Sequence, residues 1–314
     1  MLKRIRWYLE IAFVVAVSFA VALLPNRALL PVGRSLGRIF FLLLKRRREI
    51  AIDNIRGSLS FLESQPGWQG GTPRQIARET FENLGCCLVE LCRIYQGRGR
   101  DLIDAVEFRG LEHYEAAAAK GKGVAFLTAH CGNWELLALS FGARYHDVSV
   151  IARRQDNPHL NRMTERIRRA FGNGVIYREG ALRAMFAAFK RREIVGLLID
   201  QAVHPSVGAL VDFLGRPAWT TKLPALIARK SGTPMIPAFI HREGGKQIVT
   251  VYPEYQVAAH EDEELCAVKD ARAMARYLQD YVIQHPAQWY WVHKRWKNAP
   301  VAPAAAGESA AAGE

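Results

Sequence analysis

The sequence has few cysteines, five among 314 residues. Their number is odd, and none forms a CxxC pair or a Cys/His set with zinc-ligand spacing. Disulfide frameworks and structural zinc sites depend on such spacings, so we expect neither here. The main domain is therefore predicted to lie in a reducing cytosol. The cysteines are Cys86, Cys87, Cys92, Cys131 and Cys266.

Glycine-rich phosphate loops are also missing. Neither GxGxxG nor GxxxxGK followed by Ser or Thr occurs, and the chain has no internal repeat. These loops cradle the phosphates of nucleotides, so nucleotide chemistry gains no support from the sequence.

The chain lacks an uninterrupted apolar run long enough to cross a membrane. Residues 11–24 are apolar or small, whereas a span takes about 20 residues. Extending the apolar run back to Ile5 reaches the needed length but includes Arg6 and Glu10. Both lie near the end of the segment, where their side chains can reach the membrane–water interface. We therefore predict a single N-terminal anchor that is either a marginal span or a deeply inserted helix.

No clear A-x-A cleavage site follows Leu24, so retention of this segment is favoured over a signal peptide. More cations follow the segment than precede it, which places the main domain on the cytoplasmic face by the positive-inside rule. The domains we expect are an anchor with its basic flank (1–48), a main domain (49–298) and a disordered tail rich in Ala, Pro and Gly (299–314).

Acidic residues are fewer than basic ones, which gives a formal net charge of +13. Four cations, at 45–48, directly follow the apolar residues 39–44. A basic block beside a hydrophobic segment is typical of contact with anionic lipid, so a membrane is favoured and no nucleic acid partner is expected.

Short strand-like runs alternate with helical ones after the turn-rich residues 64–73. The strands are predicted at 123–129, 148–152, 194–199 and 235–240, and the helices at 134–141, 160–171 and 182–190. A further helix carries Ile76, Leu84, Leu88, Leu91 and Tyr95 near one face. The alternation predicts an α/β fold with a mixed, mostly parallel sheet flanked by helices.

His130 and Glu135 stand out at the end of the first predicted strand. Residues 123–137 indicate a strand, a tight turn and a helix that starts near Asn133, a good N-cap. The two side chains can meet only if the histidine precedes the helix and the glutamate is in its first turn. A paired carboxylate would hold the imidazole in one tautomer, making His130 a general base.

The ordinary alternative is that His130 is a buried histidine and Glu135 complements the helix dipole. With nine histidines, roughly one such spacing arises by chance, so the spacing alone is weak support. A second pattern, GxSxG at Gly33–Gly37, matches a serine nucleophile elbow at Ser35. It lacks a preceding strand, and small residues in a membrane-associated turn explain it more simply.

Residues 151–192 are strongly basic, with eleven cations against three carboxylates. This excess suits phosphorylated headgroups or an acidic carrier protein, although a solvated helix face has a similar composition.

Five motifs in order resemble the bacterial lipid A biosynthesis late acyltransferases, the lauroyl- and myristoyltransferase-like family of the lysophospholipid acyltransferase superfamily. The resemblance runs from the N-terminal anchor to about Lys297. The motifs are TAHCGNWE, ARRQDNP, LLIDQ, DFLGRPA and QWYWVHKRWK.

The resemblance implies an O-acyltransferase of the cell inner membrane that needs no cofactor or metal. Acyl carrier protein or acyl-CoA is the donor, and a hydroxyl of a lipid A precursor in lipopolysaccharide biosynthesis is the acceptor. The HxxxxE dyad falls on His130 and Glu135. Substrate-binding positions are implied at Arg168 (with Arg169 an alternative), Asp200, Asn133, Arg153 and Gln201.

Because the motifs contain unmodified GNWE and DQ sequences, another glycolipid or an aminolipid stays open as the acceptor lipid. The mechanism we expect is direct attack of the hydroxyl on the thioester, without an acyl-enzyme, with Glu135 orienting His130. Backbone N–H groups near Gly132 and Asn133, or Arg168, would stabilise the oxyanion. A serine hydrolase using Ser35 and a non-catalytic protein that binds anionic lipid remain as alternatives.

Overall fold

A mixed seven-stranded sheet forms the centre of the molecule in the computed structural model, which describes residues 2–259 and 261–300. The strand order is β1-β9-β8-β2-β5-β3-β4, and only the β8–β9 pair is antiparallel. The predicted α/β class is confirmed. The strands are β1 (Glu107–Arg109), β2 (Val124–Thr128), β3 (Val148–Ala152), β4 (Gly174–Tyr177), β5 (Ile194–Leu198), β8 (Met235–Glu243) and β9 (Lys246–Val251).

Strand β2 shows why the sheet forms where it does. All five of its residues are buried, because helices cover both faces of a parallel sheet and leave no polar side. Each of the four predicted strands is present at its expected place: 148–152 matches β3 at both ends, and the ends of the other three differ by at most three residues.

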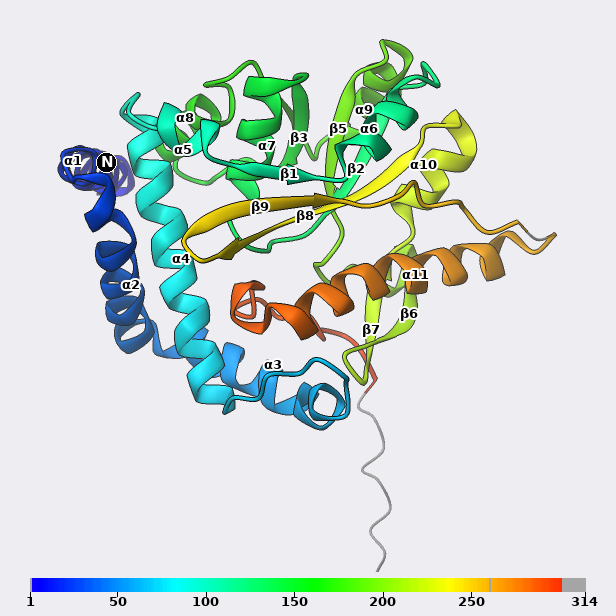
Figure 1. Cartoon of the computed structure of the whole chain (residues 1–314), viewed down its shortest axis with the longest axis horizontal. Coiled ribbons are helices and arrows are strands. Elements are labelled where there is room, and N and C mark those ends of the chain that lie inside the picture. The colour runs from blue at the N-terminus through cyan, green and yellow to red at the C-terminus, as the bar shows by residue number, and fades with distance from the viewer. Residues whose placement is uncertain (1, 260, 301–314) are drawn as a thin grey trace, which may run out of the picture.

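Helices surround the sheet (Figure 1). The three predicted between residues 134 and 190 are α7, α8 and α9, so these predictions are confirmed. The helices are α1 (Leu2–Ala22), α2 (Asn26–Leu43), α3 (Lys45–Glu63), α4 (Pro73–Tyr95), α5 (Arg100–Asp104), α6 (Leu111–Ala118), α7 (Trp134–Arg144), α8 (Pro158–Arg168), α9 (Ala181–Lys190), α10 (Leu223–Ser231) and α11 (Glu263–Gln284), with short 3-10 turns η1 (Pro205–Val207) and η2 (Pro286–Gln288).

Helix α4 is the predicted helix after the turn-rich segment, and it packs on the main domain as expected. Thr72 caps its first turn by accepting a hydrogen bond from the N–H of Gln75. Ile76 is buried in the core beneath α11, and Leu91 packs on the core beneath the sheet. Leu88, by contrast, is 38 % exposed.

The GxSxG pattern lies in the middle of α2, so the expected turn is wrong. Its glycines instead allow α2 to lie directly on α4: a Cβ at Gly33 would be 2.6 Å from Cα of Cys86, and one at Gly37 would be 2.2 Å from the carbonyl oxygen of Phe81. Ser35 is on the exposed side of the helix. Without a strand before it, Ser35 does not form a nucleophile elbow.

A two-stranded hairpin and the chain after α11 cover the side of the molecule on which α11 lies. The hairpin strands are β6 (Gly208–Phe213) and β7 (Arg216–Thr221). Trp289 and Trp291 are fully buried there, with ring centroids 4.5 Å apart. This C-terminal segment crosses under the end of β2, since Cys131 pairs with Trp289 and the N–H of Tyr290 donates to the carbonyl of His130.

The N-terminal helix α1 meets the length and hydropathy requirements of a membrane span over Lys3–Ala22. It lies at the edge of the molecule against α4 and α8 (Figure 1). Residues 301–314, which hold most of the predicted disordered tail, lie outside the described residues.

Candidate active site

His130 lies at the carboxyl end of β2, as predicted, in the turn that leads into α7. The turn requires a glycine at position 132, because φ there is +50° and a Cβ would be 2.2 Å from the carbonyl oxygen of Ile240. Asn133 caps α7 by accepting from the N–H of Leu136. The turn is thus fixed directly after the histidine.

Asp200 is the carboxylate bonded to His130. Nδ1 of His130 is 2.8 Å from Oδ1 of Asp200, which has no exposed surface. Strands β2 and β5 are parallel with Thr128 beside Leu198, so residues two positions beyond each strand end are neighbours. The other oxygen of Asp200 accepts from the indole N–H of Trp289 at 3.1 Å.

The surroundings keep Asp200 ionised. Burial alone would raise the pKa of its carboxyl, but the charge of His130 and the hydrogen bonds from His130 and Trp289 outweigh burial and hold this pKa well below its usual range. An ionised carboxylate only accepts hydrogen bonds, so Nδ1 carries the proton and Nε2 of the neutral ring keeps its lone pair.

The same contact makes His130 a stronger base. Burial alone would lower the pKa of the imidazole, but the charge and hydrogen bond of Asp200 outweigh it, and the pKa is raised. The charge of Glu135 acts in the same direction, while that of Arg168 opposes it. The imidazole is 16 % exposed, so a substrate can reach it.

Glu135 does not orient the histidine, contrary to the expectation from the sequence. Both of its oxygens accept from Arg168 on α8, Nη2 to Oε1 at 2.5 Å and Nε to Oε2 at 3.0 Å. The neighbouring Arg169 pairs with Glu165 on its own helix instead. The structure therefore brings four predicted residues together as two pairs, His130 with Asp200 and Glu135 with Arg168.

The other predicted positions differ in their surroundings. Asn133 is buried, and its side chain is used within the protein as a cap and as a donor to Glu90. Arg153 is exposed just beyond the end of β3, and Gln201 is exposed beside Asp200. Of these three, only Arg153 and Gln201 present side chains to solvent.

An apolar cavity opens beside the two pairs, with about 530 Å³ of empty space that includes some open solvent. Its walls come from β2, β3, β5, α7 and α8. Glu135 and Arg168 are the charged lining residues. Trp134 joins the cavity to the histidine, because its ring lines the cavity and lies 5.1 Å from the ring of His130.

Glu90 on α4 supports the turn, and no sequence motif pointed to this residue. This buried carboxylate accepts from Asn133 at 2.8 Å, from Arg242 of β8 at 2.7 Å and from Gln247 of β9 at 3.2 Å. Its partners are 43 to 157 positions away, so only the folded sheet places them together. The network links α4 to the start of α7.

The C-terminal motif QWYWVHKRWK contributes to the site in ways that its residues alone did not predict. Trp289 donates to Asp200, and Nε2 of His293 lies 3.3 Å from the carbonyl oxygen of Asp200. Arg295 is buried close enough for the charge of Asp200 to act on it, although burial lowers its pKa to about 10. The motif thus encloses the buried carboxylate.

A histidine bonded to a buried carboxylate, beside an apolar cavity, is an arrangement typical of enzymes that transfer or cleave acyl groups. The sequence matches the bacterial lipid A biosynthesis acyltransferases over residues 2–298, so the chain belongs to that family and is an O-acyltransferase.

Named relatives agree with this class. The chain is 25 % identical to the lipid A biosynthesis lauroyltransferase of Escherichia coli K12 over 91 % of its length and 90 % of the relative's. It is 23 % identical to the palmitoleoyltransferase of the same organism over 88 % of each chain. It is 27 % identical to a phosphatidylinositol mannoside acyltransferase of Mycobacterium tuberculosis H37Rv, over 60 % of this chain and 58 % of the relative.

Replacement of Asp200 by Asn tests the pairing. Asp200→Asn removes the charge that raises the pKa of His130, so the acidic limb of the pH profile of kcat/KM should move to lower pH, and kcat should fall by about 10²-fold or more. Glu135→Gln, the matched control, leaves Asp200 in place and should shift the limb less. An equal or larger shift with Glu135→Gln would assign the orienting role to Glu135.

Proposed function

We propose that this enzyme moves a fatty acyl chain from an acyl thioester to a hydroxyl of a membrane lipid, with His130 as general base and no acyl-enzyme. The observation that carries the proposal is the His130–Asp200 pair beside the apolar cavity. The pair supplies a base with a fixed tautomer, and the cavity suits an acyl chain.

In the proposed reaction, Nε2 of His130 takes the proton of the acceptor hydroxyl while its oxygen attacks the thioester carbonyl. The tetrahedral intermediate then collapses, the C–S bond breaks, and the imidazolium returns the proton to the departing thiolate. The products are an ester and a free thiol, so protons and electrons balance without a cofactor. Asp200 stabilises the imidazolium between the two steps.

Arg168 or the first turn of α7 stabilises the oxyanion of the tetrahedral intermediate. The N–H of Gly132, expected to take part, already donates to the carbonyl of Gln288 at 2.7 Å. Glu135 engages Nε and Nη2 of Arg168 and so fixes the guanidinium at the cavity. This pairing gives Glu135 a role as a positioning residue for Arg168, in place of the role first expected of it.

The donor carries negative charge whether it is acyl carrier protein or acyl-CoA. Exposed cations on and around α8 and α9, next to the cavity, suit either donor by charge complementarity. Arg153, Arg162 and Arg183 are among them. Gln201 and Arg153 are the exposed candidates for substrate contact.

A lipid A precursor is the acceptor we favour, at the cytoplasmic face of a cell inner membrane. The match to the lauroyltransferase covers 91 % of the chain, whereas the match to the phosphatidylinositol mannoside enzyme covers 60 %. The cations that flank the N-terminal helix support this location, because they suit the anionic cytoplasmic leaflet. Another glycolipid or an aminolipid remains the second choice.

The test of the base is His130→Ala in cells that otherwise lack the protein. Mass spectrometry of total lipids should show a species lighter by one acyl group, which the parental gene removes and the variant does not. The purified variant should lose about 10²- to 10⁴-fold in rate. Parental turnover by a folded His130→Ala protein would contradict the assignment. Ser35→Ala is the matched control and should restore the lipid fully.

Absence of an acyl-enzyme is tested by incubation with radiolabelled acyl donor alone. Because the hydroxyl attacks the thioester directly, the protein should carry no acid-stable label after denaturation. Label that survives acid and maps to a peptide of this chain would establish a covalent intermediate, while leaving the transferase activity itself in place.

The cavity is tested by a pair of substitutions with opposite effects. A Cβ at Gly196 would project into the cavity, only 3.7 Å from Val148 and 3.9 Å from Val150, so Gly196→Ala fits without displacing them. It should favour donors that are shorter by a carbon or two and lower kcat/KM for the parental donor by about tenfold. Leu198→Ala enlarges the same cavity and should favour longer donors. Unchanged chain preference in both variants would place the acyl chain elsewhere.

A further inference from the structure

Exposed apolar side chains follow one face of α1 along its whole length. Leu9, Phe13 and Phe19 are 66, 71 and 59 % exposed, and Ile5 and Leu23 continue the row at its two ends. Their spacing keeps them on one side of a helix. Such a continuous apolar surface marks an interaction site on a protein that is otherwise strongly charged.

The opposite face of α1 is attached to the main domain near the start of the helix. The amide of Asn157, which caps α8, donates to the carbonyl of Trp7 at 3.2 Å and to Oε2 of Glu10 at 3.0 Å. The rings of Tyr8 and His159 are 4.6 Å apart. Glu10, which would be costly within a membrane, is thus bonded by the main domain in addition to Arg6 of its own helix.

The end of α1 is attached in the same way. The amide of Gln96, just after α4, donates to the hydroxyl of Ser18 at 2.6 Å. The guanidinium of Arg98 donates to the carbonyl of Ala22 at 3.2 Å. Both ends of the candidate span therefore touch polar groups of the main domain.

These attachments exclude a helix that crosses the bilayer while it stays docked. Glu10 and Ala22 are about 18 Å apart along the helix axis, more than half of the roughly 30 Å hydrocarbon layer. A perpendicular α1 would carry Asn157 or Arg98, with the helices that adjoin them, deep into the hydrocarbon. A helix parallel to the surface leaves every one of these polar groups outside.

Helix α2 extends the same surface in a second direction. In Figure 1, α1 is seen end-on and α2 descends along the same edge, both on the outer side of α4. The last turn of α2 exposes Leu42 and Leu43 by 66 and 73 %. Arg27, Arg34 and Lys45 are exposed on or next to α2. Both helices thus lie on the same edge of the molecule, with exposed apolar side chains and cations beside them.

We infer that α1 and the end of α2 lie in the plane of an anionic lipid surface, so that the protein is anchored to one leaflet and does not span the bilayer. The inference rests on the proposed membrane acceptor. Apolar side chains enter the headgroup boundary, and the neighbouring cations contact anionic headgroups. Helix α8 then links the lipid surface to the proposed active site, because Asn157 at its start bonds to α1 and Arg168 at its end lines the cavity.

The depth of three spin labels along α1 tests this inference. All five native cysteines are buried, so in the folded full-length chain labelling favours introduced thiols at Ile5→Cys, Phe13→Cys and Leu23→Cys. In vesicles of phosphatidylethanolamine and phosphatidylglycerol, the three labels should have similar depths of about 5–10 Å. A spanning helix would place position 13 some 12–15 Å deeper than both ends, and that result would overturn the inference.

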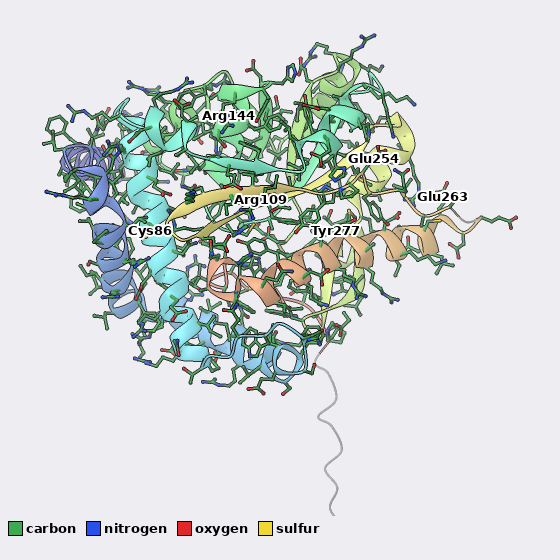
Figure 2. The ribbon with its side chains drawn as sticks, viewed as in Figure 1. Cys86, Arg109, Arg144, Glu254, Glu263 and Tyr277 are labelled. Carbon is green, nitrogen blue, oxygen red and sulfur yellow. The ribbon has the colours of Figure 1, made fainter. Side chains whose placement is uncertain are left out.

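The matched control is Glu263→Cys at the start of α11, on the opposite edge from α1 (Figure 2). Its label should stay in water whether or not vesicles are present. Binding should weaken at least tenfold on purely zwitterionic vesicles, and equal binding would remove the anionic lipid from the proposal. Acyl transfer measured in the same vesicles separates the two claims. Activity together with the label depths of a spanning helix would reject only the in-plane anchor. Shallow label depths without activity would reject only the proposed function.

Discussion

The hydrogen bond between Asp200 and His130 joins two neighbouring parallel strands at their carboxyl ends, and the rest of the site depends on it. A buried carboxylate is costly unless it is bonded, and here His130 and Trp289 supply the bonds. Trp289 reaches Asp200 because the C-terminal segment crosses beneath the ends of β2 and β5. The requirement to satisfy one carboxylate therefore explains why the last described residues of the chain take part in a site formed near its middle.

Local pattern was sufficient to place His130 at a strand end before a helix, and to predict the sheet and its flanking helices. The partner of His130 was not predictable in the same way. Distance along the chain favoured Glu135, five positions away, but the register of β2 with β5 decides which side chains meet. That register follows from long-range packing. Glu90 was missed for the same reason, since its partners lie on α7, β8 and β9.

The charges of the site are arranged in pairs that leave one proton acceptor facing the substrate. Arg168 neutralises Glu135, and Arg242 neutralises Glu90 beneath the turn. Asp200 has no exposed surface, so its charge acts through the imidazole. In the proposed mechanism, Nε2 of His130 is consequently the basic atom presented to an acceptor hydroxyl, whereas a free carboxylate there would repel the phosphates of an anionic lipid or donor.

In the proposed arrangement, α8 connects the membrane attachment to the catalytic site. This helix is held at its first turn by contacts with α1 and at its last turn by the ion pair with Glu135. With α1 in the lipid surface as proposed, the position of α8 would fix the distance between that surface and the mouth of the cavity. An acyl chain in the cavity and an acceptor in the leaflet would approach His130 from two sides of the same helix. An anchor that lies in the plane and packs along α8 sets this distance more tightly than a spanning helix joined by a flexible linker, because packed helices do not move independently.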